Sequence, residues 1–282
     1  MRLNPFNTGN IKVRSSGGRG GAAGGIGCGT LVLAALGYFI FGADPMQTIG
    51  MVEGAGGGGG QVTSGSQDEQ AICTSSAYSR EACNGLESLN QTWAQVFDEQ
   101  NVRGFQTPTL DLPTARSWRT GCGTGQAAMG PFYCPADQTI YIDTGFYDQL
   151  AQMSGTGGDF ARLYVLAHEY GHHVQYITGV SQQIRSAQQA NPRQQNALNV
   201  RMELHADCYA GVWAGRNRNL IEPGDLEEGM AAASAIGDDV LTQGRVSAEQ
   251  FTHGTSAQRT EALRLGIQTG DDRQCDQRYL RI

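Results

Sequence analysis

The sequence predicts an α+β domain, most of it helical, that is preceded by one transmembrane helix. Residues 26–43 form an uncharged, apolar stretch. The run TIYID (139–143) alternates apolar and polar residues, as a strand with one buried face does. Several later segments repeat their apolar residues at helical spacing. A chain of 282 residues is long enough for one domain of this kind with appendages.

The first quarter of the chain divides into segments of different character. Residues 1–25 are basic and glycine-rich, which predicts a disordered tail. Residues 26–43, extended back to Ala22, give about 20 uncharged residues, enough to cross a bilayer as a helix. Residues 44–70 contain the run EGAGGGGG and are interpreted as a linker, so the folded domain is expected over 71–282.

The order of charge and apolar residues sets the expected topology. Arg2, Lys12, Arg14 and Arg19 precede or border the apolar stretch, and no acidic residue lies before position 44. The positive-inside rule therefore predicts a cytoplasmic N-terminus and a domain on the outer side. A cleaved signal peptide is the alternative, but it needs small residues where the chain has Ile-Phe at 40–41. A retained anchor is the preferred interpretation.

The rest of the chain is acidic. The formal net charge is −7, and with four basic residues before position 44, the remainder holds 16 of the 20 basic residues against all 27 acidic ones. A surface of this sign argues against nucleic acid or an anionic lipid surface as the partner of the domain.

The cysteines point to disulfides in an oxidising compartment. Six of the seven lie beyond residue 70, and an even number permits complete pairing. No CxxC pair occurs, which argues against a zinc ribbon held by thiolates. Six cysteines leave many pairings open. The simplest set joins Cys73 with Cys83, Cys122 with Cys134, and Cys208 with Cys275.

The domain is expected to contain one hairpin and a series of helices. The run MGPFYCPADQTIYID predicts a hairpin whose turn is PAD. The polar, glutamine-rich segment 181–194 is expected to be a mobile connection, with a lid over the substrate as the alternative. Helices are expected at 88–100, 159–178, 195–216, 224–242 and 255–269.

The run HEYGH, residues 168–172, has the spacing of a metal site. His168 and His172 are four residues apart and project from the same side of a helix, as two ligands of a tetrahedral zinc would. Glu169 is rotated by about 100° and can lie beside the metal, where it could take a proton from water. The alternative is a helix whose histidines are solvated or buried in the core.

A third ligand is available from the following helix. Gln175 and Thr178 exclude the arrangement HExxHxxGxxH. The run RMELHADCYAGVWA instead places Glu203 and Asp207 one turn apart. Glu203 would complete a site of two histidines and one glutamate with a fourth position open to water. Asp207 would accept the N–H of a ligand histidine and fix its tautomer.

The remaining histidines differ in their expected roles. His173 and His205 lack the spacing to join the same metal face and are interpreted as structural. His253 precedes a helix beside Gly254, where it could stabilise an oxyanion. Arg259 could pair with a carboxylate of the site, or cap and pack.

Five runs together resemble the bacterial putative neutral zinc metallopeptidase family. They are GPFYCPADQTIYID, HEYGHHVQ, ELHADCYAGVWA, AASAIGDD and THGTSAQR, in the order of the family and over about 70–280. THGTSAQR is also similar to a histidine-and-arginine stretch of the membrane-associated M48 peptidases, in which proline usually follows the histidine. Gly254 stands at that position here.

The resemblance implies a gluzincin-like fold with a small mixed sheet, an active-site helix and a helical remainder. It implies that His168, His172 and Glu203 bind one zinc ion per chain and that Glu169 is the general base for peptide hydrolysis. The expected partner is a peptide or protein substrate, held in extended form if the strand at 139–143 edges the cleft. The expected location is the bacterial inner membrane, through a single helix, with the domain periplasmic or otherwise extracytoplasmic.

Two other functions remain open on the sequence. The first is a membrane-tethered binding module that contains zinc but does not cleave peptides. An open fourth coordination position argues against zinc that is purely structural. The second is a hydrolase for another substrate, such as cell-wall cross-links, because zinc chemistry does not identify the bond that is cleaved.

Overall fold

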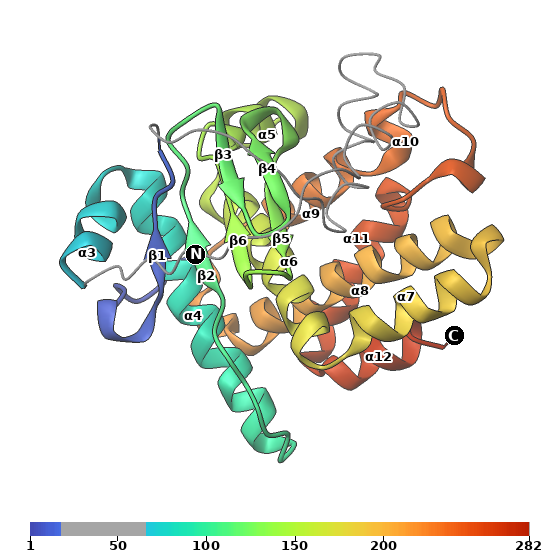
Figure 1. The fold of residues 1–282 in the computed structure, drawn as a ribbon, viewed down its shortest axis with the longest axis horizontal. Helices are drawn as coiled ribbons and strands as arrows, with labels where there is room; N and C mark the ends of the chain where they lie inside the picture. Colours follow the sequence, from blue (N-terminus) through green and yellow to red (C-terminus); the bar gives the residue numbers. More distant parts are fainter. Residues whose placement is uncertain (18–65, 282) are drawn as a thin grey trace.

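The computed structural model describes residues 1–17 and 66–281, and Figure 1 shows how their elements are arranged. The larger sheet has the order β1-β2-β6-β5; β1, β2 and β6 are parallel, whereas β5 is antiparallel to β6. β3 and β4 form a separate antiparallel pair. The strands are β1 (Val13–Arg14), β2 (Thr109–Asp111), β3 (Ser117–Thr120), β4 (Gly123–Gln126), β5 (Phe132–Cys134) and β6 (Thr139–Tyr141).

Helices make up most of the remaining described chain. They lie around the larger sheet and extend away from it on the side of α7, α8 and α12 (Figure 1). Their bounds are α3 (Ser66–Thr74), α4 (Ala77–Glu99), α5 (Phe146–Ser154), α6 (Asp159–Ile177), α7 (Val180–Ala190), α8 (Gln195–Arg216), α9 (Asp225–Ala235), α10 (Asp238–Leu241), α11 (Ser256–Thr269) and α12 (Asp272–Tyr279). The small mixed sheet and the helical remainder are therefore as expected.

Helix α6 is the central element of the core. It contacts β5 and β6 on one side and α4, α8 and α9 on others. A helix with neighbours all round must be apolar on most of its surface. Ala161, Leu166 and Ala167 are each at most 1% exposed, and at 3.6 residues per turn they lie on different sides of the helix. The polar residues of HEYGH are therefore embedded in a helix that is otherwise core.

Small residues let α8 pack closely against its two main neighbours. A Cβ atom on Gly171 of α6 would lie 3.0 Å from the carbonyl oxygen of Ala206 on α8. A Cβ atom on Gly266 of α11 would lie 2.0 Å from the carbonyl oxygen of Cys208. Helix α8 is thus held between α6 and α11, which fixes where its acidic side chains point.

The expected hairpin and helices are present, but the structure differs from the expectation within 224–242 and 181–194. The hairpin is present as β5 and β6. The helix expected over 224–242 is broken into α9 and α10 at Gly237, whose Cβ atom would lie 2.3 Å from the backbone nitrogen of Ser256. The segment 181–194 is not a loop: α7 continues to Ala190, and one apolar residue, Ile184, anchors it at 1% exposure.

Residues 1–17 contradict the disordered tail expected over 1–25. β1 pairs with β2, and Val13 lies opposite Leu110. The side chain of Arg14 donates from Nε to Oδ2 of Asp111 at 2.7 Å. Composition indicated disorder, but Ile11 and Val13 are 4% and 1% exposed because a sheet edge is available for their burial.

The predicted transmembrane helix is not supported by the structure. Within 1–17 and 66–281, no helix combines the length and apolar character needed to span a bilayer, and residues 26–43 lie outside the described ranges. β1 comes before the expected anchor and β2 after it, yet they are neighbours in one sheet. A single membrane crossing between them would separate them, so the predicted topology, and with it the single-pass inner-membrane location, is wrong.

The predicted disulfides are confirmed in full. Cys73 bonds to Cys83, Cys122 to Cys134, and Cys208 to Cys275. The last of these joins α8 to α12 across 67 residues of sequence. Three disulfides are compatible with an oxidising, extracytoplasmic compartment.

Replacing Cys208 and Cys275 together by alanine should lower the free energy of unfolding by about 4 kcal/mol, because the bond closes a long loop in the unfolded chain. The matched control is the pair Cys73 and Cys83, which are equally buried but only 10 residues apart. Loop-closure entropy predicts about 3 kcal/mol for that pair. Urea unfolding of both variants measures the difference, and a larger loss for the short loop would contradict the expectation.

Candidate active site

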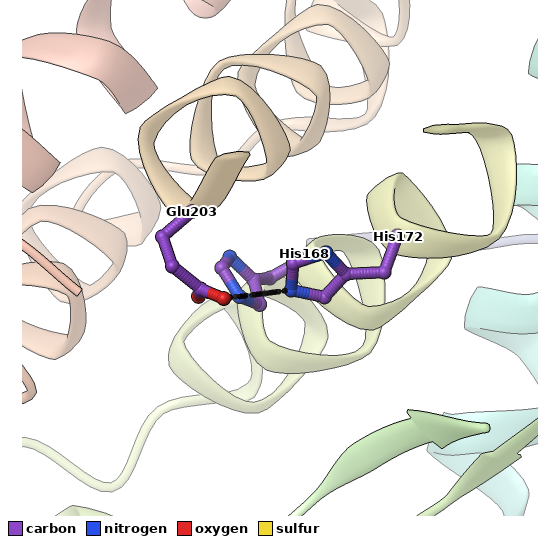
Figure 2. Close-up of side chains that lie close together, drawn as sticks. All are labelled: His168, His172 and Glu203. Atoms are coloured by element: carbon purple, nitrogen blue, oxygen red, sulfur yellow. Dashed lines mark hydrogen bonds and ion pairs between the residues drawn. The ribbon is translucent and has the colours of Figure 1, made fainter. Parts of the chain in front are cut away.

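The site lies where α6 and α8 cross. His168 and His172 extend from α6 and meet the carboxylate of Glu203 from α8, as Figure 2 shows. The close approach of the helices at Gly171 brings the glutamate within reach of both imidazoles. All three side chains are largely withdrawn from solvent, with side-chain exposures of 8%, 14% and 4% in the order given.

Two imidazole nitrogens and one carboxylate meet at spacings that suit a tetrahedral metal. The Nε2 atoms of His168 and His172 are 3.2 Å apart. Glu203 places Oε2 at 3.2 Å from the first imidazole and Oε1 at 3.5 Å from the second. Two ligands of a tetrahedral zinc, each about 2.0–2.1 Å from it, are separated by about 3.3–3.5 Å. The group could therefore hold a metal ion.

The hydrogen bonds of the two histidines leave their Nε2 lone pairs for that ion. Nδ1 of His168 donates to Oδ1 of Asp207 at 2.7 Å. Nδ1 of His172 lies 2.9 Å from Oε1 of Gln175, which can only accept. With the protons on Nδ1, two nitrogen lone pairs and the carboxylate of Glu203 converge without a donor among them. Such a set can bind a cation, and two imidazoles with one carboxylate are ligands typical of zinc.

The surroundings favour positive charge at this point. Burial lowers the pKa of His168, but Asp207 and Glu203 outweigh burial and raise it to about 10. Burial also lowers the pKa of His172, and Glu203 reverses the direction. Burial raises the pKa of Glu203, yet the two histidines hold it well below its usual value. The carboxylate is therefore ionised and ready to bind a cation.

A buried ion pair supports His168 from behind. Arg259 donates to Asp207 through Nε at 2.8 Å and Nη2 at 2.9 Å, and the hydroxyl of Tyr164 donates to the same carboxylate at 2.6 Å. Arg259 also donates from Nη1 to the carbonyl oxygen of Ile236. The structure thus places Asp207 on His168 and Arg259 on Asp207, both 2% exposed or less. Sequence patterns alone did not single out Tyr164.

Glu169 faces a cleft beside the metal-ligand group. The cleft has a volume of about 480 Å³, and His168, His172, Glu203 and Glu169 all line it. Burial raises the pKa of Glu169, and the neighbouring histidines offset part of that shift. Within the described chain, its carboxylate has no hydrogen bond or ion pair. It is therefore free to exchange a proton with a molecule bound in the cleft.

His253 lines the same cleft, and Asp238 orients it. Nδ1 of His253 is 3.0 Å from Oδ1 of Asp238. The other carboxylate oxygen accepts the backbone N–H groups of Thr252, His253 and Gly254. Burial raises the pKa of Asp238, but His253 lowers it overall. Asp238 belongs to the run AASAIGDD, which is part of the resemblance to the family but did not predict this role.

The walls of the cleft differ from the expectation at two places. The strand at its edge is β5, represented by Phe132 and Tyr133, whereas the strand that contains TIYID lies between β2 and β5 in the sheet. Helix α7 forms another wall through Arg185 and Gln188. The first arm of the hairpin, β5, is therefore the one that a bound molecule can reach.

His173 and His205 have partners away from the donor atoms, which agrees with structural roles. His173 donates from Nε2 to the carbonyl oxygen of Gln106 at 2.6 Å and accepts from the hydroxyl of Tyr133 at 3.0 Å. Burial lowers its pKa to about 4, so it is neutral. His205 bonds to Gln175 and to Asp276.

A second acidic group in the described chain consists of Asp159, Asp225 and Glu228. Two of its carboxylates pair with the amino group of Met1, at 2.8 Å from Asp159 and 3.1 Å from Asp225. The group has only oxygen donors, which zinc prefers less than a set with imidazoles. The HEYGH group is therefore the better candidate.

Comparison with protein families matches residues 6–278 to the family described as putative neutral zinc metallopeptidase. The chain belongs to that family. It is also similar to the uncharacterized protein YpfJ of Escherichia coli K12, with 49% identity over 197 residues that cover 68% of each chain. The uncharacterized protein Rv2575 of Mycobacterium tuberculosis is 40% identical over 205 residues, or 67% of each chain. No solved structure matches.

The geometry of the site does not identify the metal, whereas the description of the family names zinc. Its description specifies zinc and peptide hydrolysis, which agrees with a donor set of two imidazoles and a carboxylate. The match extends from before β1 to α12, so the N-terminal strand is part of the family's domain.

Proposed function

We propose that the protein is a zinc-dependent peptidase of the gluzincin type. One observation carries the proposal: donor atoms of His168, His172 and Glu203 lie 3.2–3.5 Å apart at a cleft, with the carboxylate of Glu169 beside them. A zinc ion held there would polarise the scissile carbonyl and lower the pKa of water toward about 7.

The residues of the chain then have separate tasks. Glu169 accepts a proton from the attacking water and delivers it to the leaving amine. His253, when protonated, can donate from Nε2 to the oxyanion, and the carboxylate of Asp238 at Nδ1 balances that charge. Asp207, itself held by Arg259, keeps the proton of His168 on Nδ1.

The shape of the cleft favours an extended peptide. β5 is an edge strand of the larger sheet and lines the cleft, so its free backbone groups can pair with a substrate strand. Apolar side chains line the cleft, among them Phe146, Val165, Ile236 and Leu241. A substrate with apolar side chains is therefore expected.

Replacing Glu169 by glutamine should separate a peptidase from a binding module. We expect zinc binding to be unchanged and cleavage of a peptide library to fall by about 10²- to 10⁴-fold, since only the proton acceptor is lost. Zinc per chain and cleavage rate are measured on the full chain. Cleavage that persists in the variant would rule out Glu169 as the base, and a zinc-loaded parent that cleaves no peptide would favour a binding module or another hydrolase.

A further inference from the structure

A continuous line of hydrogen bonds runs from His172 into the protein interior. It starts at Gln175, which is 0% exposed and one turn further along α6. Its Oε1 lies 2.9 Å from Nδ1 of His172. Its Nε2 lies 2.7 Å from the carbonyl oxygen of Met202 and 3.0 Å from Nδ1 of His205. The amide has all of its partners within the protein.

The partners determine which way each bond points. The carbonyl oxygen of Met202 can only accept, so the amide nitrogen of Gln175 must face it. The amide oxygen then faces His172, whose Nδ1 must carry a proton. The second N–H of the amide points at Nδ1 of His205, which must accept, so the proton of His205 is on Nε2. No other assignment satisfies all of these contacts.

The line ends at the surface on α12. Nε2 of His205 donates to Oδ1 of Asp276 at 2.9 Å, and the hydroxyl of Tyr209 donates to the same oxygen at 2.8 Å. The side chain of Asp276 is 42% exposed, whereas His205 is 0% exposed. The disulfide between Cys208 and Cys275 ties α12 to α8 next to this carboxylate.

From this geometry we infer that Gln175, His205 and Asp276 are positioning residues that set the zinc affinity of the site. They hold the proton of His172 on Nδ1 and fix the direction of its Nε2 lone pair. His168 is held by a buried ion pair, whereas His172 is held through the amide of Gln175 and the imidazole of His205, which connect it to the partly exposed carboxylate of Asp276. The inference rests on the proposed zinc site, and it assigns a role to residues that do not line the cleft.

Zinc dissociation constants of the full chain, measured by competition with a chelator, test the relay. Gln175→Met keeps the length of the side chain but removes the hydrogen bonds of its amide. We therefore expect zinc to bind about 10- to 100-fold more weakly. Asp276→Leu should weaken zinc binding about tenfold. Asp276→Asn keeps an oxygen acceptor for His205 and should restore most of the affinity.

The combined variant shows whether the residues act through one another. Gln175→Met with Asp276→Leu should bind zinc about as weakly as Gln175→Met alone, because the relay is already broken at Gln175. Losses that multiply would overturn the relay. The matched controls are Gln277→Ala, an exposed neighbour on α12, and Tyr209→Phe, which leaves the bond between His205 and Asp276 in place.

The outcomes separate this inference from the proposed function. If the parent binds zinc and Gln175→Met binds it equally well, the relay has no role and the zinc site stands. If the parent binds no zinc at the HEYGH group, the proposed function fails and the relay fails with it.

Discussion

Replacing Glu203 by alanine is expected to weaken zinc binding by more than about 100-fold, beyond the loss that outer-shell partners cause. The two imidazoles would remain, but two neutral ligands neither complete a tetrahedral site nor balance the charge of the ion. The carboxylate approaches both Nε2 atoms at 3.2 and 3.5 Å, so it acts on the whole group. Zinc content after gel filtration and chelator competition measure the loss.

A matched control separates this site from the other acidic group. Asp225 is buried to a similar degree and belongs to the group around the amino group of Met1. If zinc binds at HEYGH, Asp225→Ala leaves the dissociation constant unchanged. Equal zinc content in the Glu203 variant and in the parent would show that the ligand assignment is wrong. Circular dichroism of both variants without metal checks that they are folded.

The site could be predicted from the sequence because its spacing is local. A separation of four residues on a helix brings His168 and His172 to one face, and the same spacing places Glu203 and Asp207 one turn apart. What the spacing could not supply is the contact between helices. The structure places these pairs together because Gly171 allows α6 and α8 to approach.

The partners of these residues were harder to predict, because they depend on tertiary contacts. Asp238 reaches His253 across 15 residues, and Asp276 reaches His205 across 71. The sequence did not single out Tyr164, and it drew on Gln175 only to exclude the arrangement HExxHxxGxxH. Their roles follow only from what lies opposite them in the fold.

The fold was predicted well where pattern and packing agree. The hairpin and the helices after residue 159 follow from alternation and helical spacing. The N-terminal segment was missed because composition describes a segment in isolation. Glycine and basic residues around Ile11 and Val13 suggested disorder, but the exposed edge of β2 gives these two residues a partner.

Replacing Asp207 by alanine is expected to lower the free energy of unfolding by about 3–5 kcal/mol, because it leaves Arg259 buried without its counter-ion. Arg259 is 2% exposed, and the carboxylate accepts two of its N–H groups. Urea unfolding in the presence of a chelator measures this effect without metal. Replacing both residues, Asp207→Leu with Arg259→Met, should be less harmful than Asp207→Ala, since no buried charge is left unpaired.

The pH dependence of stability gives an independent test of the same pair. Burial raises the pKa of Asp207, but Arg259 and His168 outweigh burial and lower it to about 2. An aspartate in the unfolded chain has a pKa of about 3.9, so the unfolded state takes up the proton first as pH falls. The carboxylate therefore stabilises the fold fully above about pH 5, and about 2 kcal/mol of that contribution is lost by pH 2.

Asp207→Asn keeps the shape of the side chain and an oxygen acceptor but cannot titrate. Between pH 5 and pH 2, the metal-free free energy of unfolding of this variant should fall by about 2 kcal/mol less than that of the parent. A variant with the same acid dependence as the parent would mean that Asp207 is not held ionised by Arg259. His168 would then be held by its hydrogen bond to residue 207 alone, and the ion pair with Asp207 would not explain why Arg259 is buried.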